Sequence, residues 1–286
     1  MPRIAYVQGR YRRHAEAAVP IEDRGYQFAD GVYEVVTIQN GHLVDEAGHL
    51  DRLERSLSEL AIAAPMSRRA LGLVMRELIR RNGVREGMLY LQITRGTAPR
   101  DFKFPARAEP TLVMTVRRAD LKATDKMARG VAVITIPDIR WKRRDIKSIS
   151  LLPQVLGKQK AAEAGAFEAW QVDEDGYVTE GCSSNAWIVT RDGVIVTRDL
   201  STRILAGITR GSLVRLIGDL GYRLEERPFS VEEAYAAREA FLTSATTYAM
   251  PITRIDDRSV GNGHPGDIAA ALRRAYEGYA EGAGAS

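Results

Sequence analysis

One lysine of the sequence stands beside an apolar stretch. Lys147 lies in the run DIKSISLL, whereas Lys122, Lys126 and Lys142 have polar neighbours. A lysine in a partly desolvated pocket has a lowered pKa and attacks carbonyl carbons, as Schiff-base chemistry requires. The simpler interpretation is a lysine at the end of a strand whose stem covers the core. Taken alone, this lysine favours the simpler interpretation.

The segment VTEGCSSN places an acidic residue, Glu180, at the end of a short strand-like run. A carboxylate in such a place can pair with a ring nitrogen and keep it protonated. The turn that follows offers small hydroxyl side chains, Ser183 among them. In the simpler interpretation Glu180 only ends a strand and the next residues only form a turn. In isolation this simpler interpretation is again preferred.

A third set of residues is suited to binding an anion. Residues 207–209 (GIT) open a predicted helix, 208–220, whose free N–H groups and positive dipole end attract phosphate. Thr209 adds a hydroxyl, although it is equally an ordinary first-turn residue. The loop 243–247 supplies further hydroxyls, and Arg52 can supply a counter-charge. None of these features is specific by itself.

Together these groups suit one cofactor. A lysine for an aldehyde, an acid for a pyridine nitrogen and a helix N-terminus with an arginine for a phosphate describe pyridoxal 5′-phosphate. The single cysteine, Cys182, and four histidines without metal-ligand spacing provide no metal cluster. The sequence therefore predicts pyridoxal 5′-phosphate and no metal ion.

Helical and strand-like periodicities alternate irregularly along the chain. Without strict βαβ order, an α+β fold with antiparallel or mixed sheets is expected. The predicted helices are 49–61, 67–81, 153–164 and 208–220, and the predicted strands are 4–7, 32–39, 88–94, 111–116, 131–136, 169–172, 177–180, 186–190, 194–197 and 240–243.

A polar, aperiodic stretch near residue 120 predicts a domain boundary. We expect a smaller N-terminal domain at 1–118, a linker at 119–126 and a larger C-terminal domain at 127–286. The long loop between strands 88–94 and 111–116 is expected to have a function of its own.

The composition excludes several classes of protein. The 286 residues include 41 Lys or Arg and 37 Asp or Glu, so the net charge is 41 − 37 = +4. The arginines are scattered among acidic residues, which argues against a nucleic-acid partner. No apolar run approaches the roughly 20 residues of a membrane span, and the opening residues lack a signal-peptide pattern. With one cysteine, a reducing cytoplasm is expected.

Seven segments, in order and over nearly the whole chain, resemble the D-amino-acid aminotransferases. These are class IV (fold type IV) pyridoxal-phosphate enzymes, related to the branched-chain aminotransferases. The resemblance implies a homodimer whose protomers have a small N-terminal α/β sandwich and a larger C-terminal pseudo-barrel domain, with the active site between them. The segments are EDRGYQFADGVYEVV (22–36), HLDRLERS (49–56), TRGTAPR (94–100), DIKSISLLPQVLGKQKA (145–161), VTEGCSSNAW (178–187), ILAGITR (204–210) and TSATTYAMP (243–251).

By this resemblance Lys147 is the Schiff-base lysine and carries the proton of the 1,3-shift. Glu180 pairs with the pyridine nitrogen, and Arg52 binds the phosphate. Backbone amides at the start of the helix also hold the phosphate, and a leucine packs against the ring. The further cofactor-binding residues implied are Leu205, Ile208, Thr209, Ser183, Ala245 and Thr246.

The resemblance also implies a substrate pocket. Tyr33 and Arg100 hold the substrate α-carboxylate, with Arg100 reaching in from the neighbouring subunit, and Val35 is assigned to the same pocket. The chain departs from the family pattern at two places: Phe102 stands where a histidine is usual, and Ala245 where a threonine is usual. An aromatic residue at 102 makes the pocket more apolar, which would admit primary amines without a carboxylate.

The resulting hypothesis is ping-pong transamination between a D-amino acid such as D-alanine and a 2-oxo acid such as 2-oxoglutarate. The runs GVYEVV and TRGTAPR favour this D-specific activity. Within the same fold the alternatives are a branched-chain L-transaminase, an (R)-amine transaminase and an aminodeoxychorismate lyase. Outside it, a basic binding protein without catalysis remains open.

Overall fold

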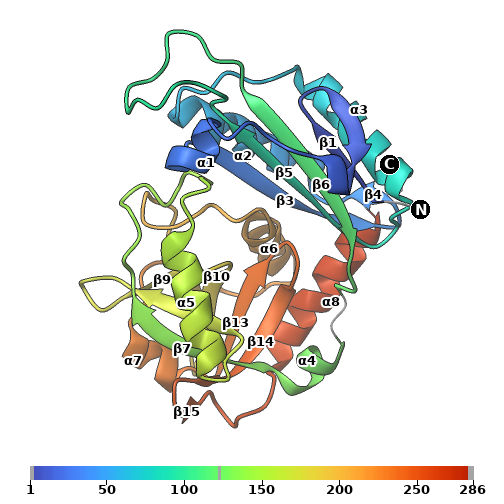
Figure 1. Ribbon diagram of the computed structural model, residues 1–286. Coiled ribbons are helices and arrows are strands. Elements are labelled where there is room, and N and C mark those ends of the chain that lie inside the picture. The colour runs from blue at the N-terminus through green and yellow to red at the C-terminus, as the bar shows by residue number, and fades with distance from the viewer. Residues whose placement is uncertain (1–2, 122–123, 283–286) are drawn as a thin grey trace. The chain divides into compact units, whose positions relative to one another are not determined.

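The chain is described by a computed structural model that covers residues 3–121 and 124–282 (Figure 1). Its contacts divide it into two compact units. The described part of the first unit comprises residues 3–121, 146–150 and 281–282, and that of the second comprises 124–145 and 151–280. The domain limits expected from the sequence stay a prediction. Residues 122 and 123 of the expected linker lie outside the described residues.

The first unit contains a six-stranded antiparallel sheet with the order β2-β1-β6-β5-β3-β4. Asn40 and Gly41, with φ of 52° and 85°, form the tight turn between β3 and β4. The strands are β1 (Ile4–Val7), β2 (Arg10–Arg13), β3 (Gly31–Gln39), β4 (His42–Leu43), β5 (Gly87–Thr94) and β6 (Thr111–Arg118).

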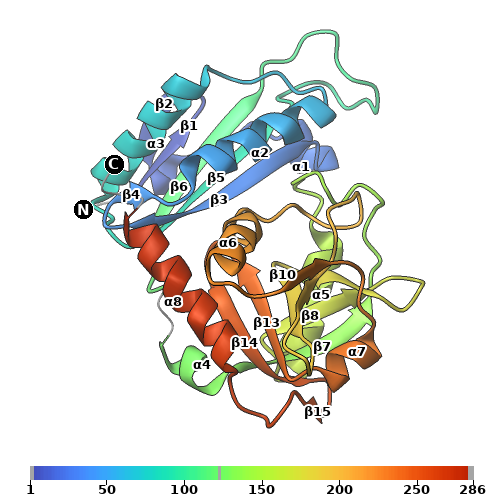
Figure 2. The ribbon, with the colours of Figure 1, turned by 180° about the vertical axis from the view of Figure 1, so that it is seen from behind.

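Two amphipathic helices, α2 (Glu46–Glu59) and α3 (Arg68–Asn82), cover one face of this sheet (Figure 2). Their apolar stripes pack against the core-facing side chains of β3, β5 and β6. The hydroxyl of Ser67 caps α3 by accepting from the Ala70 N–H, and Gly83 ends it in a left-handed conformation. On the other face, the alternate side chains Tyr33 and Val35 of β3 and Met88, Tyr90 and Gln92 of β5 are only partly buried.

The second unit contains a nine-stranded mixed sheet with the order β12-β11-β10-β13-β14-β7-β8-β9, and β15 pairs with β14. Three strand pairs are parallel: β11 with β12, β14 with β7, and β7 with β8. The end strand β9 also contacts β10, so the sheet curls back on itself. The strands are β7 (Val131–Pro137), β8 (Glu168–Val172), β9 (Val178–Gly181), β10 (Asn185–Val189), β11 (Ile195–Thr197), β12 (Leu224–Glu226), β13 (Glu239–Ser244), β14 (Tyr248–Ile255) and β15 (Arg258–Ser259).

Helices pack against this curled sheet. α5 contacts β7 and β8, and α6 contacts β12 and β13. The helices are α4 (Thr124–Arg129), α5 (Leu152–Glu163), α6 (Ile208–Asp219), α7 (Val231–Ala236) and α8 (Asp267–Gly282). The expectation of an α+β fold with a curled second sheet is confirmed. Among the described residues, no helix combines the length and the apolar character needed to cross a membrane.

Several elements were not predicted from the sequence. The short helix α1 (Arg24–Phe28) and the 3-10 turn His14–Glu16 lie in a stretch that the sequence analysis left without elements. β14 carries a proline and begins at a residue with φ of 55°, both unusual in a strand. α8 contains Gly278 and Gly282 near its end, and glycine lowers helix propensity. Five further elements are too short to show a period in the sequence: β2, β4, β12, β15 and α7. The polar stretch near residue 120 leads into the short helix α4.

Candidate active site

Lys147 lies on a short extended segment that pairs with the beginning of β3. The N–H of Tyr33 donates to the Lys147 carbonyl and the N–H of Ile149 donates to the Gly31 carbonyl, both at 3.0 Å. The Lys147 N–H reaches the Ser56 hydroxyl of α2 at 3.3 Å. Since its backbone is bonded on both sides, the side chain of Lys147 extends from a well-fixed position.

The Lys147 amine lies over an aromatic ring on the face of the first sheet that α2 and α3 do not cover. This face is called the open face below. Its Nζ is 4.3 Å from the ring centroid of Tyr33, and the ring of Tyr90 on β5 lies 5.9 Å from that of Tyr33. Burial raises the pKa of Tyr90 to about 12, and its hydroxyl donates to Gln92 Oε1 at 2.6 Å. Val35 pairs with Tyr90 in the strand register. The structure thus places Lys147 beside Tyr33, two residues that the sequence analysis assigned to one site.

Arg52 is held by a buried carboxylate that the sequence analysis did not single out. Its Nε and Nη2 donate to the two carboxylate oxygens of Glu34 at 2.8 and 2.7 Å, and His49 Nδ1 lies 2.7 Å from the same carboxylate. Burial alone would raise the pKa of Glu34, but Arg52 and His49 lower it to about 2. A charged residue at a core-facing position of the apolar run VYEVV is the signal that marks Glu34.

Arg100 and Phe102 lie on the loop 95–110 between β5 and β6. Both contact Phe28 of α1. The Arg100 guanidinium carbon is 4.7 Å from the Phe28 ring centroid, and the ring of Phe102 is 5.4 Å away. The side chain of Phe102 is otherwise 81% exposed. These two predicted substrate residues are therefore neighbours.

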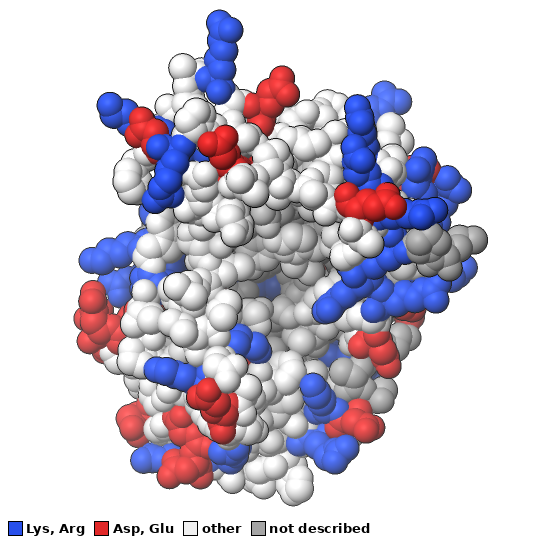
Figure 3. Space-filling model, in the orientation of Figure 1, with Lys and Arg blue, Asp and Glu red and all other residues white. Residues whose placement is uncertain are grey.

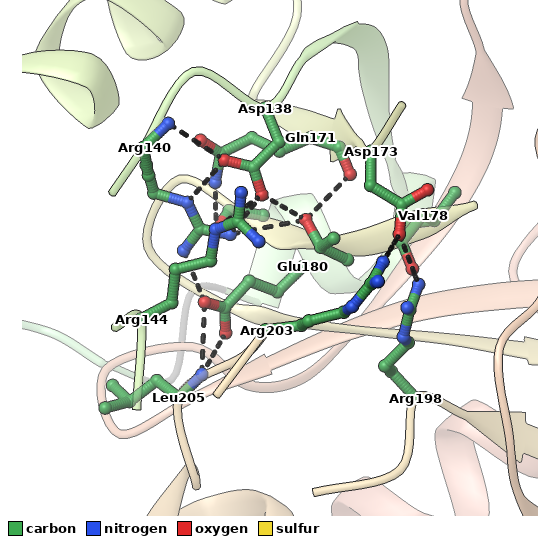
Figure 4. Close-up of polar contacts among 12 residues, drawn as sticks. Asp138, Arg140, Arg144, Gln171, Asp173, Val178, Glu180, Arg198, Arg203 and Leu205 are labelled. Carbon is green, nitrogen blue, oxygen red and sulfur yellow. Dashed lines mark hydrogen bonds and ion pairs between the residues drawn. The ribbon is translucent and has the colours of Figure 1, made fainter. Parts of the chain in front are cut away.

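Glu180 of β9 is the centre of a buried polar network in the second unit (Figure 4). Its carboxylate accepts hydrogen bonds from Arg140 Nη1, from Asn185 Nδ2 at 3.1 Å and from the Leu205 N–H at 3.1 and 3.2 Å. Burial raises the pKa of Glu180, whereas the Arg140 charge and the Leu205 N–H act in the opposite direction. The structure brings the predicted residues Glu180 and Leu205 together.

Arg140 is shared between two carboxylates. Its Nε and Nη2 donate to Asp138 at 3.0 and 2.7 Å, while Nη1 serves Glu180. The Thr179 hydroxyl donates to the Asp138 carboxylate at 2.7 Å, and Arg144 Nε lies 3.3 Å from the same carboxylate. Burial alone would lower the pKa of Arg140. The two carboxylates outweigh burial and raise the pKa above its ordinary value, so the guanidinium stays charged. Neither Arg140 nor Asp138 was predicted, because no motif joins them to Glu180.

The N-terminus of α6 lies at the end of the segment that begins at Leu205. Gly207 is the N-cap, and no side chain caps the helix. A Cβ at Gly207 would meet Asn185 Oδ1 at 2.0 Å, so only glycine allows this close approach. The Thr209 hydroxyl is buried and has no hydrogen-bond partner in the described part of the chain. Free helix N–H groups beside an unsatisfied buried hydroxyl form a suitable place for an anion.

Ser183 belongs to the tight turn that follows Glu180. Its N–H and hydroxyl donate to Glu168 Oε2 at 3.2 and 2.7 Å, and the Ser184 hydroxyl donates to the same oxygen at 3.2 Å. Glu168 is almost completely buried on β8. Glu168, which no sequence motif marks, fixes this turn through bonds to a backbone N–H and two hydroxyls.

Ala245 and Thr246 lie in the turn between β13 and β14. The Ser244 hydroxyl is 2.8 Å from the Thr247 hydroxyl and 3.4 Å from that of Thr246. Hydroxyl groups therefore gather in this turn although residue 245 supplies none.

Each unit thus holds its own set of predicted residues. The first unit contains Lys147, Tyr33, Val35, Arg52, Arg100 and Phe102, and the second contains Glu180, Ser183, Leu205, Ile208, Thr209, Ala245 and Thr246. In the described ranges, no group of three or more His, Cys, Asp or Glu side chains is arranged to hold a metal ion.

Comparisons with known proteins give a consistent family. The protein-family model described as "Amino-transferase class IV" matches residues 31–255. D-alanine aminotransferase of Bacillus licheniformis is 43% identical over 270 residues, which cover 94% of each chain. D-alanine aminotransferase of Staphylococcus epidermidis is 36% identical over 274 residues, which cover 96% of each chain.

Solved structures agree with the fold. A branched-chain amino acid aminotransferase from the thermophilic archaeon Thermoproteus uzoniensis, solved with norvaline, superposes with a TM-score of 0.85 at 25% identity, covering 97% of this chain and 94% of that one. The 4-amino-4-deoxychorismate lyase of Pseudomonas aeruginosa gives a TM-score of 0.81 at 25% identity, covering 96% and 98%. Because the class IV family model matches most of the chain and a D-alanine aminotransferase is 43% identical over nearly its full length, the chain belongs to the class IV aminotransferases.

Proposed function

We propose that this aminotransferase transfers the amino group of a D-amino acid, with D-alanine as the reference substrate, to a 2-oxo acid such as 2-oxoglutarate. The observation that carries the proposal is the 43% identity to a D-alanine aminotransferase over 94% of both chains. The branched-chain aminotransferase and the lyase resemble this chain less in sequence, at 25% identity. The D-specific activity is therefore preferred over the other activities found in this fold.

The residues of the second unit suit pyridoxal 5′-phosphate, the cofactor of class IV aminotransferases. The α6 N–H groups at Ile208 and Thr209, together with the unpartnered Thr209 hydroxyl, donate to the phosphate. The Glu180 carboxylate holds the proton at the ring nitrogen, and Leu205 packs against the ring. When bound, the cofactor supplies a conjugated ring that withdraws electrons from the α-carbon of the substrate.

Further groups complete the cofactor set that we propose. Arg52 adds a positive charge for the phosphate while its pair with Glu34 fixes the guanidinium. Ala245 and Thr246 add backbone N–H and hydroxyl groups from the turn between β13 and β14. Ser183, whose N–H and hydroxyl both donate to Glu168, contributes by holding the turn that follows Glu180.

The chain's own base is Lys147. Its Nζ would hold the cofactor through the aldehyde carbon in the resting enzyme and, when free, would take the proton from the substrate α-carbon. The fixed backbone of the 146–150 segment limits the reach of this amine. The ring of Tyr33 lies 4.3 Å from Nζ and orients the amine on this face of the sheet.

Substrate selection is assigned to the open face of the first sheet and to the loop 95–110. Arg100 pairs with the α-carboxylate, Tyr33 and Val35 line the pocket, and Phe102 supplies an apolar wall. A charge-assisted bond of this kind is worth roughly 1.5 to 3 kcal/mol. Phe102 in place of a hydrogen-bonding residue leaves Arg100 as the main contact to the carboxylate.

We also propose a homodimer in which Arg100 of one copy reaches the active site of the other. Large apolar side chains near α1 and its loop are highly exposed, including Ile21 at 83% and Tyr26 at 81%, and a second copy would cover them. On the face drawn in Figure 3, acidic side chains accompany basic ones in most places. The absence of a nucleic-acid or membrane partner and a cytoplasmic location stay predictions.

The function is tested with the purified holoenzyme and 2-oxoglutarate as acceptor. We expect rapid turnover of D-alanine and much slower turnover of L-leucine and of (R)-1-phenylethylamine. Borohydride reduction should fix the cofactor on the peptide that contains Lys147, and Lys147→Ala should abolish this attachment. A preference for L-leucine would refute the proposal in favour of branched-chain transamination, and a preference for the amine would identify an amine transaminase.

A further inference from the structure

The short helix α1 is fixed to the rim of the first sheet by several independent bonds. Its N-cap, Asp23, accepts from the Gly25 N–H at 2.8 Å and from the Thr94 hydroxyl of β5 at 2.9 Å. A Cβ at Gly25 would meet the Thr94 methyl at 2.2 Å, so glycine permits this close packing. The Arg24 N–H donates to the Gly96 carbonyl at 2.9 Å. The five residues of α1 are therefore well anchored despite their small number.

The side chain of Arg24 joins this helix to the loop 95–110. Arg24 is 3% exposed, and its Nη1 donates to the Asp101 carbonyl at 2.6 Å while Nη2 lies 3.5 Å from the Phe102 carbonyl. Its Nε donates to Asp30 at 2.8 Å. The guanidinium thus spans from the partly buried carboxylate of Asp30 to two successive peptide carbonyls of an exposed loop.

Asp30 is in turn held by a second buried arginine. Arg95 donates to the two oxygens of Asp30 at 2.7 and 3.0 Å and to the carbonyls of Leu60 and Ala61 at 2.7 and 2.9 Å. Burial raises the pKa of Asp30, but the two arginines lower it below its ordinary value. Arg24, Asp30 and Arg95 thus form an ion-pair network. Asp30 stays ionised in it and orients both guanidinium groups.

The loop needs such an anchor because its own side chains are largely exposed. Its base is closed where Gly96, with φ of 103°, passes so near Glu109 that a Cβ would meet the carbonyl oxygen at 2.0 Å. Beyond the base, Phe102 and Phe104 are 81% and 62% exposed, and the Phe104 ring rests on Arg95 at 3.6 Å. Few buried contacts therefore hold the tip in place.

We propose that Arg24 is a positioning residue for substrate selection: by binding the Asp101 and Phe102 carbonyls, it fixes the neighbouring Arg100 in the conformation that receives the substrate carboxylate. This rests on the proposed function, in which Arg100 binds that carboxylate. The same helix supplies the second constraint, since the guanidinium carbons of Arg24 and Arg100 lie 4.8 and 4.7 Å from the ring centroid of Phe28. Arg24 itself touches neither substrate nor cofactor in this proposal.

The first experiment measures loop anchoring directly, by tryptic cleavage after Lys103 in the holoenzyme. Arg24→Lys keeps a charge for Asp30 but cannot span Asp30 and two carbonyls, and Arg24→Met removes the charge as well. We expect cleavage to be several-fold faster in both variants, with circular dichroism unchanged for Arg24→Lys. The control is Arg80→Lys on α3, whose ion pair with Glu77 is exposed. Cleavage of Arg24→Lys at the control rate overturns the proposal.

The second experiment measures what anchoring does for the substrate. In Arg24→Lys we expect KM for D-alanine to rise about tenfold, with a smaller change in kcat and in the turnover of an amine that lacks a carboxylate. Because Arg24 acts through Arg100, the Arg24→Lys change should add nothing to KM in an Arg100→Ala background. Faster cleavage with an unchanged KM, or fully additive effects, overturns the link to substrate selection.

The two proposals fail in different ways. If the wild-type enzyme does not act on D-alanine, the proposed function fails, and tryptic cleavage still decides whether Arg24 holds the loop. If D-alanine is a good substrate and Arg24→Lys behaves as Arg80→Lys does, only the role of Arg24 is refuted.

Discussion

Two buried carboxylates, Glu34 in the first unit and Glu180 in the second, both face an arginine, yet their pKa values move in opposite directions. Arg52 directs two nitrogens at Glu34, and His49 adds a third, so the pKa of Glu34 falls to about 2. Arg140 divides its nitrogens between Asp138 and Glu180, and the Asp138 charge itself raises the pKa of Glu180. Burial is similar and each carboxylate has three donors, so the charge of the donors and of nearby groups makes the difference: two guanidinium nitrogens face Glu34, whereas one faces Glu180 and the Asp138 charge opposes it.

The comparison separates a carboxylate that serves the fold from one that suits a ligand. Glu34 is surrounded by side chains of its own unit and fixes α2 on β3. Glu180 receives one guanidinium nitrogen, one amide and a single N–H shared between both oxygens. Because the Leu205 N–H is divided between both oxygens, the Glu180 carboxylate can still turn a lone pair to a cofactor nitrogen in the proposed function. Substitutions at the two positions should therefore damage different properties.

The largest effect is expected for Glu34→Gln. It leaves the Arg52 guanidinium buried without its counter-charge, which typically costs about 3 to 5 kcal/mol of folding free energy. Urea unfolding of wild type and variant measures the difference. A loss below about 1 kcal/mol would mean that the pair contributes no more than an exposed one.

The contribution of Glu34 to stability should also depend on pH. A folded-state pKa near 2 against an ordinary 4.5 stabilises the protein above pH 4.5, and this contribution is lost as the pH falls from 4.5 towards 2. The shift of 4.5 − 2 = 2.5 units corresponds to about 3 kcal/mol. The difference in unfolding free energy between wild type and Glu34→Gln should therefore shrink over this interval. A difference independent of pH would assign the stability of this pair to packing.

Glu180→Gln should affect chemistry and leave folding nearly intact. A neutral amide holds the ring nitrogen proton less well, so we expect kcat for D-alanine to fall about 100-fold, which corresponds to about 2.7 kcal/mol. Steady-state kinetics and urea unfolding, measured on one preparation, separate the two effects. An unchanged kcat, provided that proton removal limits the rate, would reduce Glu180 to a residue that only closes a strand.

The smallest effect is expected for Glu77→Gln on α3. Arg80 and Arg81 lower the pKa of Glu77 to about 2, the same value as for Glu34, but this carboxylate is open to solvent. Water screens such pairs and their side chains lose entropy on pairing, so no measurable change in stability or activity is expected. A clear destabilisation here would show that a lowered pKa, without burial, is enough to mark an important pair.

The sequence predicted the residues that occur in recognisable runs but not their partners. Lys147 and Glu180 stand out because an apolar or strand-like context surrounds a single charged side chain. Arg140, Asp138 and Glu34 act through contacts between segments 15 to 41 residues apart, and no local pattern encodes them. Helix α1 was missed for a related reason: five residues show no period, and tertiary bonds to Thr94 and Gly96 hold it.

The segment 146–150 places a constraint on how such a chain can be rearranged by gene fusion. Its residues belong to the first unit, whereas the flanking residues 145 and 151 belong to the second. A gene segment encoding residues 1–121 would therefore specify a sheet whose β3 lacks its partner at Tyr33 and a protein without Lys147. Exchange of one unit between relatives would keep the strand pairing at Tyr33 and Lys147 only if residues 146–150 were exchanged together with the first unit. The two units are therefore expected to be inherited together.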